Sequence, residues 1–93
     1  MSQWFVYILR CADGTFYTGI TTDVERRLHE HNHSNKAAKY TRSRRPLKLV
    51  YLLDCENRSE AASSEHRIRH LARQQKQGLI RAYQSDRRRH KTD

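Results

Sequence analysis

The start of the chain limits the possible folds more than any other part, because its pattern is that of a β-hairpin. Residues 4–9 form a short, continuous apolar run rich in aromatic and branched side chains, which is typical of a strand buried on both faces. Asp13 and Gly14 then supply a turn signal, and residues 15–21 form the expected return strand. The fold must therefore place other elements on both faces of this hairpin.

The length of the hairpin loop decides which side chains share a face. A two-residue loop would pair Arg10 with Tyr17 and put Tyr7 on the opposite face of the sheet. A three-residue loop over residues 12–14 requires a left-handed glycine at its third position, and Gly14 meets that requirement. We favour the three-residue loop.

In the favoured register, Leu9 pairs with Tyr17 and Tyr7 pairs with Gly19. The two tyrosines then become diagonal neighbours on one face of the hairpin. Gly19 has no side chain, so it leaves room beside the ring of Tyr7. The register thus predicts a pair of tyrosines in one site.

The rest of the chain alternates helical and extended patterns. Thr22 with Glu25, and Asn57 with Glu60, are capping boxes that predict two helix starts. The expected elements are a helix to about residue 32, a short helix at 37–42, a strand at 47–53, a helix from 57 to about 74, and a last helix that Gly78 interrupts and that ends near Tyr83.

This order, β-β-α-(α)-β-α-α, predicts a small three-stranded antiparallel sheet flanked by helices, in the α/β or α+β class. With 93 residues, the chain fits one domain, which we assign to residues 1–84. Residues 85–93 form a basic tail that we expect to be disordered. Cys11 and Cys55 are too few for a disulfide framework, and we expect both to be reduced and inert.

The net charge of +9 favours a polyanionic partner, and nucleic acid more than an anionic membrane surface. A solubilising surface with no partner is the alternative. No apolar run approaches the roughly 20 residues that would cross a bilayer, so we expect a cytoplasmic protein. Basic residues with an aromatic among them, and no acidic residue, gather in the segment that contains Lys36, Lys39, Tyr40, Arg42, Arg44, Arg45 and Lys48. Such a segment suits a phosphate backbone and an unstacked base, and the alternative is a solvated loop.

Glu65 is the most informative acidic residue. It shares a helical stripe with Ala61, Ile68 and Ala72, and this stripe is expected to face the sheet. A carboxylate in an apolar stripe is costly unless it is paired or binds a cation. The pattern leaves two interpretations open, a partly buried ion pair with Arg27 and a metal ligand.

The residues in their order along the chain resemble the GIY-YIG nuclease domain, and in particular its small stand-alone bacterial members. The resemblance covers roughly residues 3–83. Ten positions separate Tyr7 from Tyr17, and ten more lead to Arg27. The matching segments are Phe5-Val6-Tyr7, Tyr17-Thr18-Gly19, the helix segment with Arg27 and His31, and the segment that ends at Glu65. Phe5 and Val6 replace the glycine and isoleucine of the first half-motif, at positions that are structural.

The resemblance implies a metal-dependent endonuclease that hydrolyses phosphodiester bonds, in DNA more than in RNA, with a role in DNA repair or processing. It assigns catalysis to Tyr7, Tyr17, Arg27 and His31, and it assigns Mg²⁺ or Mn²⁺ to Glu65. Tyr40 matches a further active-site aromatic. Many family members carry separate domains that choose the target, so a protein partner is expected to supply specificity here. The alternative is a binding module or accessory subunit that keeps the nuclease fold without cleaving.

Overall fold

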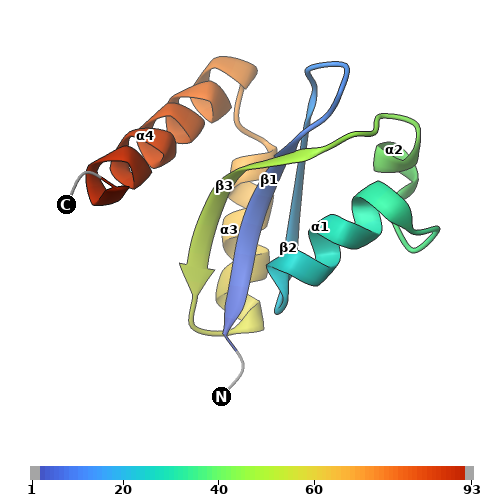
Figure 1. The fold of residues 1–93 in the computed structure, drawn as a ribbon. Coiled ribbons are helices and arrows are strands. Elements are labelled where there is room, and N and C mark those ends of the chain that lie inside the picture. The colour runs from blue at the N-terminus through green and yellow to red at the C-terminus, as the bar shows by residue number, and fades with distance from the viewer. Residues whose placement is uncertain (1–2, 92–93) are drawn as a thin grey trace.

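The computed structural model describes residues 3–91, with side chains as far as residue 87. It is an α+β fold in which helices cover both faces of a three-stranded antiparallel sheet of order β2-β1-β3 (Figure 1). The elements are β1 (Trp4–Arg10), β2 (Phe16–Thr21), α1 (Val24–His33), α2 (Lys39–Arg42), β3 (Lys48–Cys55), α3 (Arg58–Arg69) and α4 (Arg73–Lys91). The predicted order of strands and helices is confirmed.

The hairpin adopts the favoured register. Tyr7 lies opposite Gly19, and Leu9 lies opposite Tyr17. Gly14 has a φ of 85°, a conformation that residues with a side chain rarely adopt, and its N–H donates to the carbonyl of Cys11 over 2.9 Å. The loop therefore puts the two tyrosines on the same face, as predicted.

Helix α1 begins one residue later than its capping pattern suggested. The cap is Asp23, whose carboxylate accepts a hydrogen bond from the N–H of Arg26, so the prediction of Thr22 as the cap is wrong. The short helix α2 follows after a loop and packs against α1. Both elements lie on the side of the sheet that carries Tyr7.

The second half of the chain differs more from its prediction. Asn57 caps α3 as expected, but α3 ends at Arg69 instead of continuing to residue 74. The side chain of Gln75 accepts from the N–H of Ala72, which starts a new helix in a new direction. Gly78 does not interrupt α4, because a helix interior tolerates a single glycine at a cost of about 1 kcal/mol.

Helix α4 continues to Lys91, so its predicted end near Tyr83 is wrong. The division into a domain at 1–84 and a disordered tail at 85–93 stays a prediction, since residues 92 and 93 and the side chains of 88–93 lie outside the described residues. Within the described part of the chain, no helix is both long and apolar enough to cross a membrane.

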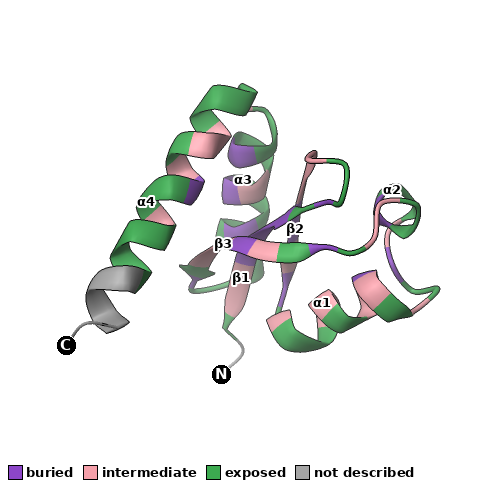
Figure 2. Cartoon of the chain, turned by 45° about the horizontal axis from the view of Figure 1, so that its top comes forward, coloured by how far each residue is buried: buried purple, intermediate pink, exposed green. Residues whose placement is uncertain are grey.

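The sheet separates two clusters of buried residues (Figure 2). The face toward α3 and α4 is apolar, with Val6 and Ile8 of β1 packed among Val50, Ala61, Ile68 and Ile80. The face toward α1 holds Tyr7, Leu9, Cys11 and Leu47. Cys11 and Cys55 are both free, as expected, and both are buried. The tyrosine pair therefore belongs to the α1 face of the sheet.

A candidate active-site cleft at the sheet edge

A cleft of about 510 Å³ lies at the edge strand β2 and brings together residues from six elements. Five of the predicted site residues line it: Tyr7, Tyr17, Arg27, Tyr40 and Glu65. Phe16, Arg69 and Lys76 line it as well, together with Thr18, Gly19 and Ile20 of β2. Residues up to 69 positions apart in sequence, from Tyr7 to Lys76, thus share one cavity.

Gly19 makes this arrangement possible. A Cβ atom built at Gly19 would lie 2.5 Å from the hydroxyl oxygen of Tyr7 and 2.7 Å from its ring carbon Cζ. The ring of Tyr7 therefore passes directly over the backbone of β2 toward the cleft. The rings of Tyr7 and Tyr17 have centroids 6.4 Å apart. Any larger residue at position 19 would push the Tyr7 hydroxyl out of place.

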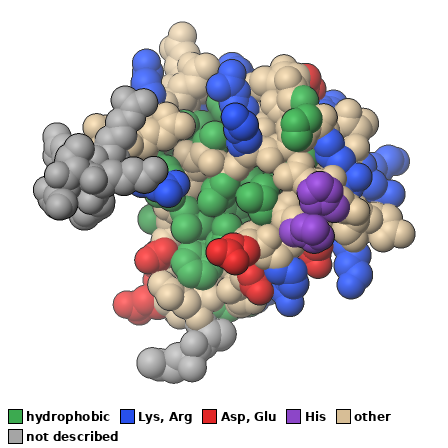
Figure 3. All heavy atoms as spheres, in the orientation of Figure 1, with side chains coloured by type: hydrophobic (Ala, Val, Ile, Leu, Met, Phe, Trp, Pro, Cys, Tyr) green, Lys and Arg blue, Asp and Glu red, His purple; other side chains and the backbone are tan. Residues whose placement is uncertain are grey.

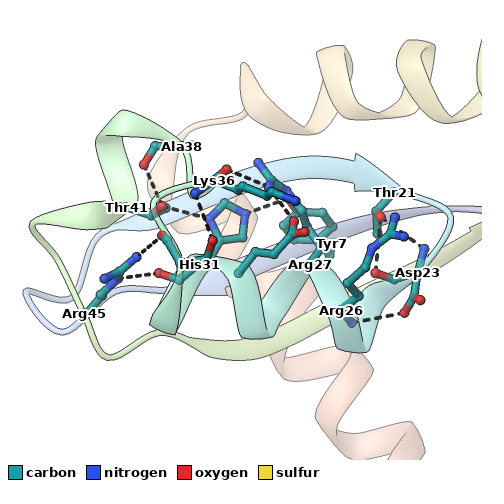
Figure 4. A network of polar contacts seen from close by, with 12 residues as sticks. Tyr7, Thr21, Asp23, Arg26, Arg27, His31, Lys36, Ala38, Thr41 and Arg45 are labelled. Atoms are coloured by element: carbon teal, nitrogen blue, oxygen red, sulfur yellow. Dashed lines mark hydrogen bonds and ion pairs between the residues drawn. The ribbon is translucent and has the colours of Figure 1, made fainter.

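His31 lies behind Tyr7 and is fully buried (Figure 4). Its Nε2 is 3.0 Å from the Tyr7 hydroxyl oxygen, and its Nδ1 is 2.8 Å from Thr41 Oγ1. The Thr41 hydroxyl donates its hydrogen to the carbonyl of Ala38 over 2.9 Å, so its oxygen must accept from Nδ1–H. His31 then carries its proton on Nδ1, and Nε2 accepts from Tyr7. The result is one chain of bonds from Tyr7 through His31 and Thr41 to Ala38.

The buried surroundings keep both ring systems uncharged. Burial lowers the pKa of His31 from 6.5 to about 4, and the Arg27 guanidinium acts in the same direction. Burial raises the pKa of Tyr7 from 10.0 to about 12, and Tyr17 beside it adds to this effect. Arg27 opposes the rise for Tyr7. At neutral pH Tyr7 is therefore a phenol that donates to a neutral imidazole.

Arg27 and Glu65 do not form the ion pair that the sequence left open. Arg27 Nη1 lies 2.9 Å from Glu30 and also donates to the carbonyl of Lys36 over 3.0 Å. Glu65 has one ionic neighbour among the described residues, Arg69, at 3.6 Å on the same helix. The Arg69 side chain is 55% exposed, so this pair is weak. The ion-pair interpretation with Arg27 is therefore wrong, and the Glu65 carboxylate faces the cleft.

The stripe predicted for α3 is also slightly rotated. The buried positions are Ala61, Ser64 and Ile68, and the side chain of Glu65 keeps 17% of its surface exposed at their border. Ala72 lies beyond the end of α3. At this position the Glu65 carboxylate is shielded but still reached by solvent.

The predicted basic segment contains an aromatic residue, two arginines that bind other parts of the protein, and four exposed cations. Tyr40 is 40% exposed, and its ring stacks against Tyr17 with centroids 6.2 Å apart. Arg44 lies 3.9 Å above the Tyr40 ring and pairs with Asp13 at 3.1 Å. Arg45 donates to the carbonyls of His31 and Ser34, which ties it to the end of α1. The exposed cations of the segment are Lys36, Lys39, Arg42 and Lys48.

Sequence reasoning missed several residues of the site. Arg69 follows Glu65 by one helical turn, a spacing that was available as a signal. Lys76 reaches the cleft only because the chain turns between α3 and α4, and no residue pattern announces that turn. Thr41 is fully buried, and its role depends on a contact with His31 across the fold.

The chain is similar to several known proteins. The GIY-YIG catalytic domain family matches residues 3–78. The chain is 57% identical over 79 residues to the UPF0213 protein DP2720 of Desulfotalea psychrophila, covering 85% of this chain and 72% of that protein. It is 50% identical over 82 residues to the UPF0213 protein YsiG of Lactococcus lactis, covering 87% of this chain and 78% of that one.

Two solution NMR structures are also similar. The UPF0213 protein BH0048 of Bacillus halodurans has 45% sequence identity and a TM-score of 0.56, with 86% of this chain and 84% of that chain covered. Protein EF2693 of E. faecalis has 38% identity and a TM-score of 0.61, with 90% and 88% covered. The fold described above is thus shared with solved relatives.

Proposed function

Because this chain belongs to the GIY-YIG catalytic domain family, we propose that it is a divalent-metal-dependent endonuclease that hydrolyses phosphodiester bonds. The observation that carries the proposal is the convergence of Tyr7, Tyr17, Arg27 and Glu65 on one cleft. A protein that only binds nucleic acid has no use for a carboxylate beside the phosphate, since it repels the ligand. The substrate we propose is DNA in preference to RNA, in a repair or processing step in the cytoplasm.

The donor set of the cleft suits Mg²⁺ or Mn²⁺. Among the described residues, no three His, Cys, Asp or Glu side chains gather at one point, so a site that needs several protein ligands is not formed there. Mg²⁺ retains several waters and binds through one or two carboxylates plus substrate phosphate. Glu65 supplies such a carboxylate. The metal, when bound, stabilises charge on the phosphate and on the departing oxygen.

Arg27 is positioned to bind a phosphate oxygen. Two of its protein contacts, to Glu30 and to the carbonyl of Lys36, use the same nitrogen, Nη1. The guanidinium also lies beside the Tyr7 hydroxyl and opposes the rise of its pKa that burial causes, so these contacts fix it in the cleft next to Tyr7. A planar, permanently charged guanidinium suits the two oxygens of a phosphate.

Tyr7 or Tyr17 orients the attacking water or takes its proton. Tyr7 has a route for a proton, because its hydroxyl already donates to Nε2 of His31. As the Tyr7 oxygen accepts a hydrogen bond from water, its own proton shifts toward His31. A pKa of about 4 makes neutral His31 a weak base, so it orients and polarises the Tyr7 hydroxyl without taking the proton completely. His31 therefore acts through Tyr7, without touching the substrate itself.

The nucleic acid is proposed to enter along α2. The half-exposed ring of Tyr40, which lies between Tyr17 and Arg44, extends the wall of the cleft and places an aromatic group next to a cation, a combination that suits a base and its phosphate. Lys36, Lys39 and Arg42 lie exposed in the same segment and suit phosphate contacts. Arg44 and Arg45 hold the segment in place through Asp13 and the end of α1, in addition to the positive charge they provide.

The test is a cleavage assay with single-stranded, duplex and branched DNA and with RNA, in the presence of Mg²⁺, Mn²⁺ or EDTA. We expect cleavage of at least one DNA substrate that EDTA abolishes. Binding without cleavage under every metal would instead support the binding module. Cleavage that appears only after addition of cell extract would support an accessory subunit that depends on a protein partner.

A further inference from the structure

A second cleft, of about 340 Å³, lies between α4 and the end of the hairpin. Its lining consists of Arg10, Phe16, Val50, Arg73, Gln77, Ile80, Arg81 and Gln84. The lining thus contains three arginines and two glutamines but no carboxylate. The first cleft, by contrast, contains Glu65. Side chains that only donate, or that donate as well as accept, favour an anionic ligand here.

The arginines of this second cleft are not neutralised by the protein. Arg10 pairs across the strands with Lys48, and like charges directly opposite each other destabilise a sheet. None of the ion pairs among the described residues includes Arg10, Arg73 or Arg81. Lys and Arg side chains in fact lie at several separate places on the face seen in Figure 3, beyond the segment at 36–48. A bound polyanion would remove the repulsion.

Contacts of Arg73 fix the geometry of the second cleft. Arg73 donates to the carbonyl of Gly14 over 3.0 Å, which fastens the start of α4 to the hairpin loop. Its guanidinium lies 4.8 Å from the centre of the Phe16 ring. Gln77 and Arg81 follow Arg73 at intervals of four residues on the same stripe of α4. The donors therefore form a row along the helix instead of a loose group.

Phe16 connects the two clefts. It lines both of them, and the first turns of α4 contribute Lys76 to the first cleft and Gln77 to the second. The start of α4 lies near the β1–β2 loop (Figure 1), where Arg73 donates to the carbonyl of Gly14. Basic side chains therefore line both clefts, on either side of Phe16, and the lining of the second cleft contains no carboxylate.

We propose that the second cleft is a phosphate-binding subsite for the backbone of the same nucleic acid strand, beyond the phosphate that is cleaved. The proposal rests on the nuclease function proposed above. It places the strand between Tyr40 on one side of the scissile phosphate and the row Arg73, Gln77 and Arg81 on the other. The spread of donors over two elements and about 340 Å³ fits successive phosphates of a chain better than one small anion.

The test measures binding of a fluorescent single-stranded DNA of about 16 nucleotides, without divalent metal, as a function of salt concentration. The double variant Arg10→Gln/Arg81→Gln removes two charges from the second cleft. The control Arg58→Gln/Arg67→Gln removes two charges from exposed positions of α3 that line neither cleft. We expect the slope of log affinity against log salt to fall by about 0.7 per lost contact in the cleft variant. The control should keep the slope of the parent.

The outcomes separate this proposal from the nuclease function. If the parent cleaves DNA but both double variants show the same slope, the subsite is rejected and the nuclease stands. If only the cleft variant shows a smaller salt dependence but the parent never cleaves, the subsite is supported and the protein is a nucleic-acid-binding protein without nuclease activity. NMR signals of the Arg10 and Arg81 Nε–H groups provide an independent check. Equal shifts with inorganic phosphate and with DNA at equal phosphate concentration would show a small-anion site and overturn the proposal.

Discussion

The face of the sheet that α3 and α4 cover is filled with hydrocarbon, whereas the face that α1 covers contains polar groups that bind one another. On the first face, Val6 and Ile8 pack against Ile68 and Ile80. On the second, the buried His31 bonds to neighbours on both sides. No buried side-chain nitrogen or oxygen among the described residues lacks a partner. One face thus supplies most of the apolar burial, and the other holds Tyr7 and His31 in a set orientation, while Glu65 of α3 reaches the cleft at the edge of the sheet.

The two faces should respond differently to substitutions. An apolar core tolerates exchanges that conserve volume, because dispersion contacts have no direction. In a buried chain of hydrogen bonds, removing one partner costs the full desolvation penalty of the group that is left unpaired. We therefore expect substitutions on the α3 face to change stability in proportion to volume, and substitutions on the α1 face to affect stability and cleavage together.

The largest expected loss of stability is on the hydrocarbon face. Ile8 is fully buried, and Ile8→Ala should reduce the free energy of unfolding by about 2–5 kcal/mol, through lost burial and the cavity left behind. Ile8→Val is the matched control, with an expected loss of about 0.5–1.5 kcal/mol. Urea denaturation of both variants measures the difference. Equal losses would show that the packing around Ile8 is loose.

The stability that the polar face contributes should depend on pH. The pKa of His31 is about 4 in the fold, below its ordinary value of 6.5, so the unfolded chain takes up a proton first as pH falls. The stability that neutral His31 contributes is complete above pH 6.5 and is lost toward pH 4, at about 1.4 kcal/mol per unit and about 3 kcal/mol in total. Denaturation across this range measures it. His31→Gln, which cannot titrate, should show a shallower decline, and an equally steep one would contradict the assignment.

A smaller loss of stability, with a large effect on function, is expected at the boundary between the faces. In Gly19→Ala the new methyl group meets the Tyr7 ring at 2.5–2.7 Å, so the ring must move and its bond to His31 breaks. We expect a loss of about 1–3 kcal/mol from this overpacking and a severe loss of cleavage.

Gly78→Ala is the matched control, because nothing lies within 4 Å of its added Cβ. In the middle of α4 it should stabilise the protein by about 0.5–1 kcal/mol and leave cleavage unchanged. Thermal melts and cleavage rates of the two variants, measured side by side, test the pair. Normal cleavage by Gly19→Ala would mean that Tyr7 does not need its observed position.

The same contrast explains how far the sequence predicts the molecule. The hairpin, its register and the tyrosine pair follow from local signals, since Gly14 sets the turn and the period of a strand sets the face. The apolar face follows from the pattern of apolar residues along the strands and helices. The turn between α3 and α4 does not, because it depends on Gln75 capping a new helix and on α4 packing against β3.

The polar contacts of the site are equally hard to predict. Arg27 had several acidic residues within conceivable reach, and it is the geometry of α1 that selects Glu30 in place of Glu65. Thr41 became a partner of His31 only through the placement of α2 against α1. The i,i+3 spacing of Arg27 and Glu30 was available as a signal, whereas the contact between Thr41 and His31 depends on a distance between two elements, which residue spacing does not encode.

Glu65 separates a nuclease from a binding protein more directly than any other residue. Glu65→Gln keeps the shape of the side chain and removes its charge, and Glu56→Gln makes the same change at an exposed position outside both clefts. Because Glu65 has only the weak contact with Arg69, its loss should change stability by less than about 1 kcal/mol.

The decisive measurement is the rate of Mg²⁺-dependent cleavage by Glu65→Gln, with DNA binding and a thermal melt recorded on the same sample. We predict that cleavage is abolished, that binding is retained or slightly tighter because a negative charge near the phosphate is gone, and that the melt is close to that of Glu56→Gln. Cleavage at the rate of the parent would contradict the account, since the metal would then not depend on Glu65.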